Sequence, residues 1–362
     1  MKSYSLVLML AIGGGLYGAA TAIADPAPAL DNGTEVIGQG EFRYRYRADK
    51  LVLPETITST WQHVHGITLG PDNDIFVTYS TDGQQNEDTR ALAHFDLDGS
   101  FLGTLGSAAM ARGNPHGLDG QEEQGQFYLY HSNFDGRVTK TDKDGQLLWS
   151  FEGAPAQPAY ENDWLAMVQG WIIDGAFSLF SKNLTLFPTA YMPCNVAFHP
   201  SEEAFYMADC YGSSLIHKFS TRDGSYQEVS FGGPGEQPGQ FNTPHGLIYD
   251  PRQQQLLVAD RGNSRLQYID LAGNPVSEVT ADAIAEPCDF DVMGEYLLIP
   301  DLSGHLVILD GNNQVVSKIE VAQQLGEQGV KYPHDAIFLP NQDIIVATWN
   351  PGTLTYWERV ED

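Results

Sequence analysis

The chain has few basic residues, few cysteines and only one long apolar run. Its 362 residues include 19 Lys and Arg against 47 Asp and Glu, which gives a net charge of −28. Nucleic acids and anionic membrane surfaces attract basic patches, so we expect neither as a partner. Three cysteines allow one disulfide in an oxidising compartment and leave an odd thiol for another use.

The apolar run lies at the N-terminus. Lys2 supplies a positive charge, residues 6–17 are apolar, and residues 22–24 form an A-x-A cleavage site. This pattern predicts a signal peptide over residues 1–24, followed by a linker over residues 25–40. The alternative is an uncleaved membrane anchor, for which the run is short. We therefore expect an exported protein, periplasmic or extracellular, with no membrane span after cleavage.

Long helical patterns are also scarce, whereas glycine (37) and proline (20) are frequent. Such a composition favours many short strands joined by turns. One register recurs six times, with an opening tripeptide, an apolar strand, a Gly/Asp/Asn turn and a second strand. The openings are HVHGI at 63–67, NPHGL at 114–118, MPCNV at 192–196, TPHGL at 243–247, EPCDF at 286–290 and YPHDA at 332–336. Repeats of roughly 40 to 50 residues with three or four strands are propeller blades.

The fourth unit resembles a complete NHL repeat over residues 241–270, FNTPHGLIYDPRQQQLLVADRGNSRLQYID. We therefore predict an all-β, six-bladed β-propeller of NHL type over residues 41–362. The last unit has only three evident strands, and an orphan segment, FRYRYR, precedes the first unit. Because a propeller must close its ring, we expect residues 41–47 to supply the missing strand of the sixth blade.

Residues 154–190 do not fit the repeat. Their apolar residues, among them Trp164, Val168 and Trp171, are spaced as in an amphipathic helix. This insertion either packs against the side of the propeller or forms a lid over its axial mouth.

Aligning the six units places four histidines and two cysteines at one equivalent position, the start of the innermost strand. We call these the ring positions: His65, His116, Cys194, His245, Cys288 and His334. All six are ligand types for zinc or a similar metal. His116, His245 and His334 come from alternating blades, so they can surround one ion and leave an axial position open, as in catalytic zinc sites. His65 either adds a fourth ligand or lines the channel.

This arrangement is similar to that of peptidyl-α-hydroxyglycine α-amidating lyase, a six-bladed propeller enzyme whose zinc histidines occupy the corresponding Pro-His contexts. The resemblance implies a zinc cofactor and marks Tyr211, in ADCYGS, as the catalytic tyrosine. It also marks Arg261, in VADRGN, as a contact to the substrate carboxylate. Asp335 would support a zinc histidine or help to hold a structural calcium.

In such a lyase, zinc and arginine would lower the pKa of the tyrosine, which would then accept the proton of an α-hydroxyl group. The chain departs from the family at one point, because its first unit has no arginine at the place of a second essential arginine. The family's third-blade disulfide has only a loose counterpart in Cys194 and Cys210. If these two pair, Cys194 is not a ligand; otherwise Cys194 and Cys288 are candidate ligands.

Three functions are compatible with the pattern. The first is a zinc-dependent lyase of the amidating type, acting on a small molecule or a peptide C-terminus with an α-hydroxyglycine or related carbinolamide group. The second is a non-catalytic propeller that binds a peptide, a carbohydrate or a protein partner, because a fold does not determine an activity. The third, a lactonase-like hydrolase, fits less well, because those propellers hold a calcium-like ion with Glu, Asn and Asp.

Overall fold

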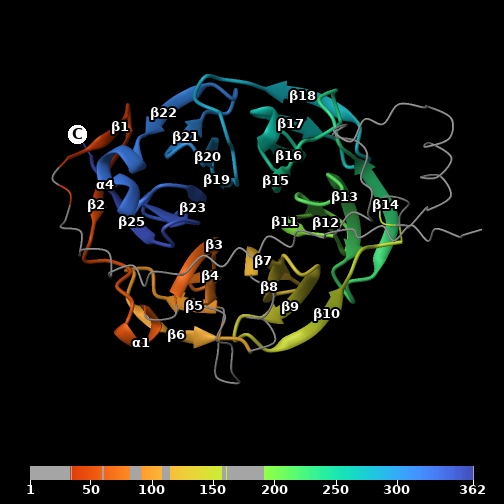
Figure 1. Ribbon diagram of the computed structural model, residues 1–362, viewed down its shortest axis with the longest axis horizontal. Coiled ribbons are helices and arrows are strands. Elements are labelled where there is room, and N and C mark those ends of the chain that lie inside the picture. The colour runs from red at the N-terminus through yellow and green to blue at the C-terminus, as the bar shows by residue number, and fades with distance from the viewer. Residues whose placement is uncertain are drawn as a thin grey trace, which may run out of the picture.

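The computed structural model shows six antiparallel sheets arranged in a ring around a central axis (Figure 1). This arrangement confirms the predicted six-bladed β-propeller. The structure describes residues 35–58, 61–81, 92–107, 115–156 and 191–361, with Gly33, Arg90 and Tyr160. The predicted signal peptide and nearly all of the insertion's central part, 157–190, lie outside these residues.

Each blade is a sheet whose strands follow one another from the axis outward. The first blade has β3 (Trp61–Leu69), β4 (Ile75–Thr81), β5 (Leu92–Phe95) and β6 (Phe101–Leu105). The second has β7 (Pro115–Glu123), β8 (Gln126–Asn133), β9 (Arg137–Asp142) and β10 (Leu147–Glu152). The third has β11 (Pro193–Phe198), β12 (Ala204–Asp209), β13 (Leu215–Ser220) and β14 (Tyr226–Gly232).

The remaining blades repeat this order. The fourth has β15 (Pro244–Asp250), β16 (Gln255–Asp260), β17 (Arg265–Ile269) and β18 (Pro275–Val279). The fifth has β19 (Asp291–Met293), β20 (Tyr296–Asp301), β21 (His305–Leu309) and β22 (Val315–Ile319). The sixth has β23 (Pro333–Phe338), β24 (Ile344–Thr348) and β25 (Leu354–Arg359), completed by β2 (Phe42–Arg47) and β1 (Ile37–Gln39).

The N-terminal strand closes the ring as predicted. β2 pairs antiparallel with β25, so the first and last parts of the chain share one sheet. The predicted linker over residues 25–40 needs a correction, since part of it is the strand β1, which pairs with β2. Gly40, with a φ of 59°, makes the turn between them. A three-residue strand without apolar alternation gives little signal in the sequence.

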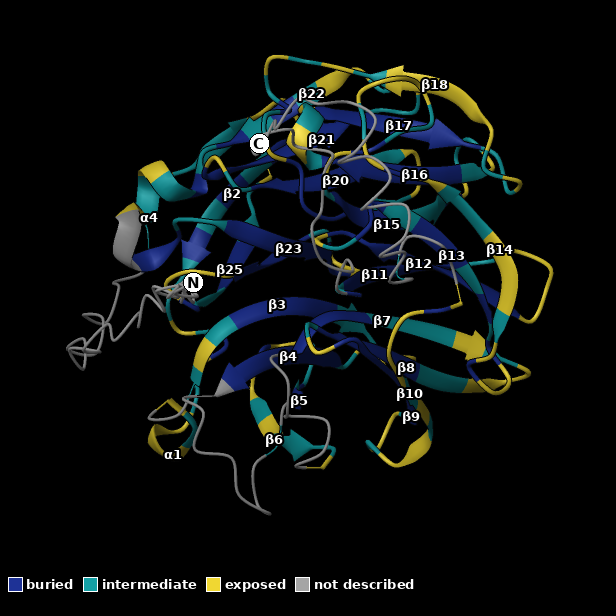
Figure 2. Cartoon of the chain, turned by 45° about the vertical axis from the view of Figure 1, so that its right-hand side comes forward, coloured by how far each residue is buried: buried dark blue, intermediate teal, exposed yellow. Residues whose placement is uncertain are grey.

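The core lies between neighbouring blades rather than in one central mass. Most residues of the inner and middle strands are buried, whereas those of the rim strands are mostly half-buried or exposed (Figure 2). β2 shows the alternation plainly, because Phe42, Tyr44 and Tyr46 are buried and the arginines between them are not. This pattern leaves the axis to polar residues, which is where the candidate site lies.

The helices of the described residues are short: α1 (Glu55–Thr58), the 3₁₀ turn η2 (Arg261–Asn263) and α4 (Val321–Gly329). α1 and α4 lie at the periphery of the ring (Figure 1), whereas η2 directly follows β16. In the part of the chain that the structure describes, no helix has the length and apolar character needed to cross a bilayer.

Candidate metal centre

Proline fixes the start of the inner strands around the axis. In the second, third, fourth and sixth blades, this proline pairs with the last residue of the second strand: Pro115 with Asn133, Pro193 with Asp209, Pro244 with Asp260 and Pro333 with Thr348. Proline has no N–H to contribute to a ladder, so the first residue of a strand accommodates it well. The ring-position residue follows each proline and is thereby placed beside the axis.

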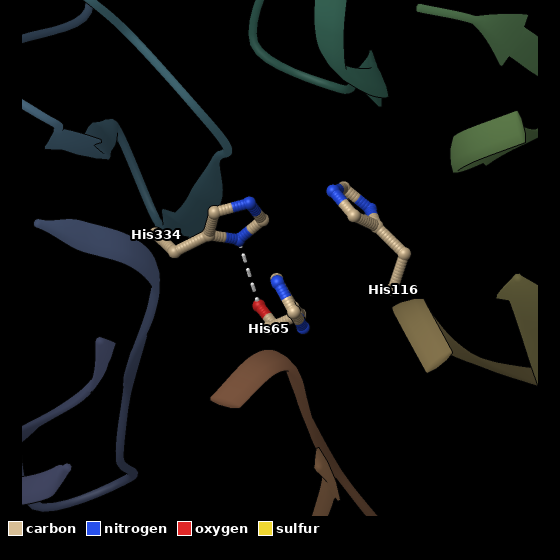
Figure 3. A group of neighbouring side chains, drawn as sticks. All are labelled: His65, His116 and His334. Carbon is tan, nitrogen blue, oxygen red and sulfur yellow. Dashed lines mark hydrogen bonds between the residues drawn. The ribbon is translucent and has the colours of Figure 1, made fainter. Parts of the chain in front are cut away.

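The four ring histidines form one buried cluster. Neighbouring rings lie 4.6–5.0 Å apart between centroids. The pairs are His245–His334 (4.6 Å), His65–His334 and His116–His334 (4.8 Å each), His116–His245 (4.9 Å) and His65–His116 (5.0 Å). Candidate ligand atoms of His65, His116 and His334 all lie within 4.8 Å of one another. Figure 3 shows these three side chains converging on the same space. A second group within the same reach joins His116 and His245 with Cys194. The ring contacts thus place the three predicted zinc ligands and His65 in one cluster, but among the described residues His245 is not in the same ion-sized group as His334.

Several imidazole nitrogens in this cluster have no hydrogen-bond partner. They are Nδ1 of His65, both nitrogens of His116 and Nε2 of His245. Nδ1 of His245 donates to the carbonyl of Cys288 (2.9 Å), and Nδ1 of His334 donates to the carbonyl of His65 (3.1 Å). Buried polar atoms without partners are rare in proteins. A neutral imidazole has one lone-pair nitrogen, so each of these three rings can offer one to a borderline metal ion.

Burial also keeps these imidazoles neutral. It lowers the pKa of His65, His116 and His245 well below the ordinary value, and that of His334 to about 3. Neighbouring histidines and the Arg261 charge lower them further. A neutral imidazole has a free lone pair, so the cluster is ready to bind a cation at ordinary pH.

The two ring cysteines have different roles. Cys194 forms a disulfide with Cys210, with their Cα atoms 5.9 Å apart, so Cys194 is not a free thiolate ligand. This resolves one alternative that the sequence left open. Cys288 is free and buried, and its sulfur accepts a hydrogen bond from Nη1 of Arg261 (3.6 Å). Among the described residues, Cys288 belongs to neither of the histidine-containing groups close enough to hold an ion.

Tyr211 and Arg261 meet beside the histidines. Nη2 of Arg261 donates to the Tyr211 hydroxyl (2.8 Å), and the Tyr211 ring lies 5.6 Å from that of His245 and 6.0 Å from that of His116. Phe134 completes the group, 4.4 Å from the His116 ring and 5.3 Å from the Tyr211 ring. Tyr211 is 41% exposed, so the group is open to solvent on this side.

Local backbone contacts position both side chains. Tyr211 directly follows Cys210, which the disulfide ties to the third ring position. Arg261 begins η2, and its N–H donates to the carbonyl of Thr243 (3.2 Å), two residues before His245. At Gly262, a Cβ atom would approach Asn242 to 2.4 Å, so only glycine allows this contact.

The protein groups alone do not produce the expected phenolate. Loss of hydration raises the pKa of Tyr211 above its usual value, and burial outweighs the lowering by the charge and hydrogen bond of Arg261. Tyr211 is therefore protonated at neutral pH in the protein alone. Arg261 opposes the shift but does not reverse it.

A second polar group lies further along the axis. Asp119, Asp289, Asp291 and Asp335 line a cavity of about 730 Å³ together with both polar and apolar residues of the inner strands. A backbone N–H group donates to each of these four carboxylates: Ile67 to Asp335 (2.6 Å), Val196 to Asp119 (3.2 Å), Phe290 to Asp289 (2.9 Å) and Phe338 to Asp291 (2.6 Å). Asp335 thus lies with other carboxylates, and it accepts a hydrogen bond from the backbone of the first blade.

Sequence reasoning missed Phe134, Asp119 and Asp289. Phe134 directly follows the second strand of its blade, as Arg261 does in the fourth, so the repeat alignment contained the signal. Asp289 directly follows the ring position Cys288, as Asp335 follows His334, so the alignment contained its signal as well. Asp119 is harder to find, because aspartate is common in this chain and Asp119 stands at a different offset from its ring residue.

Comparison with known proteins agrees with this description. The NHL repeat model matches residues 241–267. Fold and repeat together define the chain as a six-bladed β-propeller with an NHL repeat. Within this class, it has partial homology to an amidating enzyme. It is 41% identical over 80 residues to peptidylglycine alpha-amidating monooxygenase of Rattus norvegicus, and 40% identical over 93 residues to form A of Xenopus laevis.

These similarities are short. They cover 21% and 24% of this chain, and only 8% and 10% of the two relatives. Solved structures share the fold alone. A gluconolactonase of Xanthomonas campestris has a TM-score of 0.55 at 14% identity, covering 92% of this chain and 95% of its own. Virginiamycin B lyase of Staphylococcus aureus has a TM-score of 0.52 at 11% identity, covering 90% and 100%.

Proposed function

We propose that the protein is a zinc-dependent lyase that cleaves the C–N bond of a carbinolamide, with the α-hydroxylated glycine at a peptide C-terminus as its model substrate. The observation that carries this proposal is the cluster of neutral imidazoles, several with an unpartnered nitrogen, beside the hydrogen-bonded pair Tyr211–Arg261. The partial homology to amidating monooxygenases supports it, because their name describes the formation of a peptide amide.

His116, His245 and His334 would hold the ion, with His65 beside them. When bound, a zinc ion would supply a Lewis acid and would lower the pKa of the neighbouring Tyr211. The donor set supports zinc over magnesium or calcium, because imidazole nitrogen is a poor ligand for hard cations.

The reaction balances without an oxidant. The Tyr211 phenolate accepts the proton of the substrate's α-hydroxyl group, the C–N bond breaks, and its electron pair goes to the amide nitrogen. Tyr211 then returns the proton to that nitrogen, which releases a peptide amide and glyoxylate. The tyrosine is thus unchanged after each turnover.

Arg261 would bind the carboxylate that becomes part of glyoxylate. Its guanidinium already contacts Tyr211 and Cys288, which fixes its plane next to the histidines. A planar cation held in this way can recognise a carboxylate through two parallel hydrogen bonds. This contact would also place the α-hydroxyl group close to the Tyr211 oxygen.

We also propose that a hard cation such as Ca²⁺ binds the axial carboxylates, including Asp335. Burial raises the pKa of Asp335 well above its usual value and that of Asp289 to about 7. A cation with oxygen ligands would remove the cost of burying these charges together. Exported localisation remains part of the proposal, with a small molecule or a peptide C-terminus as substrate.

The test is direct. The purified protein, loaded with zinc, is incubated with N-benzoyl-α-hydroxyglycine, and glyoxylate and benzamide are measured. We expect the two products in equal amounts, and no activity after treatment with a zinc chelator. If the zinc-loaded protein produces no glyoxylate from this probe or from a peptidyl-α-hydroxyglycine, the lyase proposal is wrong and a binding propeller is favoured.

A further inference from the structure

The three alternating histidines occupy equivalent positions but differ in how they are held. Nδ1 of His245 donates to the carbonyl of Cys288, and Nδ1 of His334 donates to the carbonyl of His65. In both cases the acceptor is the ring-position residue of the next blade. For His116, the equivalent acceptor is the carbonyl of Cys194, yet both nitrogens of His116 are without a partner.

Ser132 occupies the equivalent carbonyl. Its hydroxyl donates to the carbonyl of Cys194 and accepts the N–H of Gly117 (2.8 Å). Both contacts are buried, so water does not compete for them. In the second blade, a serine hydroxyl therefore binds the carbonyl that an imidazole binds in the fourth and sixth blades.

The strand register shows that, of the second, fourth and sixth blades, only the second has a serine at this position. Ser132 is the residue before the one that pairs with the proline of the inner strand. The residues at the same position in the fourth and sixth blades are Ala259 and Ala347. Alanine has no hydroxyl group, so the carbonyl remains free to accept the imidazole N–H.

We propose that Ser132 is a positioning residue that withholds from His116 the orienting hydrogen bond of its two counterparts. The hydrogen bond on the second nitrogen of an imidazole fixes which nitrogen carries the proton and how the ring is turned. Without it, His116 is held by ring packing alone, 4.4 Å from Phe134 and 5.0 Å from His65.

His116 is therefore the most loosely oriented ligand of the proposed metal site. Its ring also contacts both Phe134 (4.4 Å) and Tyr211 (6.0 Å), and Tyr211 is on the solvent-exposed side of the site. A ligand that can turn in this place eases the arrival of a substrate atom. This consequence rests on the proposed function, whereas the hydrogen-bond difference itself does not.

Substitutions at the equivalent positions test the proposal in both directions. Ser132→Ala frees the carbonyl of Cys194, so His116 should adopt a single Nδ1–H tautomer, and zinc should bind about tenfold more tightly. Ala259→Ser installs the competing hydroxyl in the fourth blade, so zinc should bind about tenfold more weakly. Ala208→Ser is the matched control, because the ring residue of its blade, Cys194, is in a disulfide.

Two measurements are needed on each folded variant. ¹⁵N NMR of histidine-labelled, metal-free protein reports the tautomers of His116 and His245, and competition with a chelator dye reports the zinc dissociation constant. Thermal melts identify a variant that fails to fold. An unchanged mixture of His116 tautomers in Ser132→Ala, or weaker zinc binding by that variant, would overturn the proposal.

Failure of the metal site can be distinguished from failure of this inference. If the parent protein binds no zinc, the proposed function fails, but the tautomer of His116 still reports on Ser132 in the metal-free protein. If the parent binds zinc and Ser132→Ala changes neither the tautomer nor the affinity, only the role of Ser132 is wrong.

Discussion

Single residues of the ring owe their chemistry to burial. The imidazoles are neutral because they are surrounded by other rings, and the pKa of His334 falls to about 3 for that reason. The same burial acts against Tyr211, whose pKa rises although Arg261 is hydrogen-bonded to it. Burial thus keeps the ring histidines neutral and able to bind a cation. It also keeps Tyr211 protonated, so Tyr211 needs that cation to become a base.

Replacing His116, His245 or His334 with alanine should weaken zinc binding by at least about tenfold, because each removes one ligand of three. The blades hold the fold, so the melting temperature of the metal-free protein should change little. Metal analysis after dialysis and a competition titration measure the effect. His94→Ala, on β5, is the control and should leave zinc binding unchanged. A triple variant that binds zinc as well as the parent would refute the site.

Tyr211→Phe should lower kcat by about 10²- to 10⁴-fold, the usual contribution of a positioned acid or base. Zinc content should remain at the level of the parent, because the phenol ring and its packing are retained. Steady-state glyoxylate release measures the rate, with metal analysis of the same sample. A variant with the activity of the parent would show that another group moves the proton.

Arg261→Lys keeps the charge but loses the planar fork. We expect KM to rise about tenfold for a substrate with a free carboxylate, because a lysine cannot make the two parallel hydrogen bonds. An analogue in which a carboxamide replaces this carboxylate is the control, and it should respond much less. Equal losses for both compounds would indicate that Arg261 acts through Tyr211 rather than on the carboxylate.

At the scale of elements, the closing strand β2 joins the two ends of the described chain. Tyr44 is fully buried there, and Tyr46 packs against Trp357 of β25 with ring centroids 5.6 Å apart. Because a propeller distributes its core among the contacts between blades, the loss of one closing strand exposes two blade surfaces.

Tyr44→Ala should therefore lower the free energy of unfolding by about 3–5 kcal/mol, as large core truncations do. Its hydroxyl is buried without a partner, so Tyr44→Phe should be neutral or slightly stabilising. Denaturant titrations of both variants, and of a form without residues 25–48, measure the effect. A melting temperature unchanged by the deletion would contradict closure by this strand.

At the scale of the whole molecule, buried charge on the axis makes stability depend on pH. Burial raises the pKa of Asp289 to about 7 and that of Asp291 to about 6, and it raises those of Asp119 and Asp335 as well. When folding raises the pKa of an aspartate, the protonated side chain stabilises the folded state. This stabilisation is complete below the pKa of the unfolded state, about 3.9, and it is lost as the pH rises through the pKa of the folded state. The ring histidines have the opposite effect, because folding lowers their pKa. Their contribution to the free energy of unfolding is present above about pH 6.5, the pKa in the unfolded state, and is lost as the pH falls.

Asp289→Asn should therefore raise the melting temperature of the chelator-treated protein at pH 8, by on the order of 2 °C or more, and change it less at pH 5. The new side chain keeps an oxygen that can accept the Phe290 N–H (2.9 Å in the parent). Nδ2 of Asn195 donates to the other Asp289 oxygen (2.6 Å), so the Asn195 amide must turn until its oxygen accepts from the new NH2 group. Calcium should stabilise the parent at pH 8 more than it stabilises the variant. Calorimetric scans at both pH values measure this, and equal shifts at pH 5 and pH 8 would contradict it.

The sequence by itself determined the six blades, the closing strand and the ring positions. Repeats carry this information locally, because each blade needs the same alternation, turn and proline, and His116, His245 and His334 stand at the same offset in each. The family resemblance added Tyr211 and Arg261, which the structure places 2.8 Å apart, and the short strand β1 was the part of the ring that gave no clear signal.

Only the tertiary structure decided which of these residues touch. The disulfide of Cys194, the contact between Cys288 and Arg261, and the hydroxyl of Ser132 on a neighbouring blade all join residues from different segments of the chain. The direction of the Tyr211 pKa was likewise decided by packing, because desolvation depends on every ring that surrounds the phenol. Local pattern fixes the position of a side chain along a strand, whereas its partners depend on how the blades close around the axis.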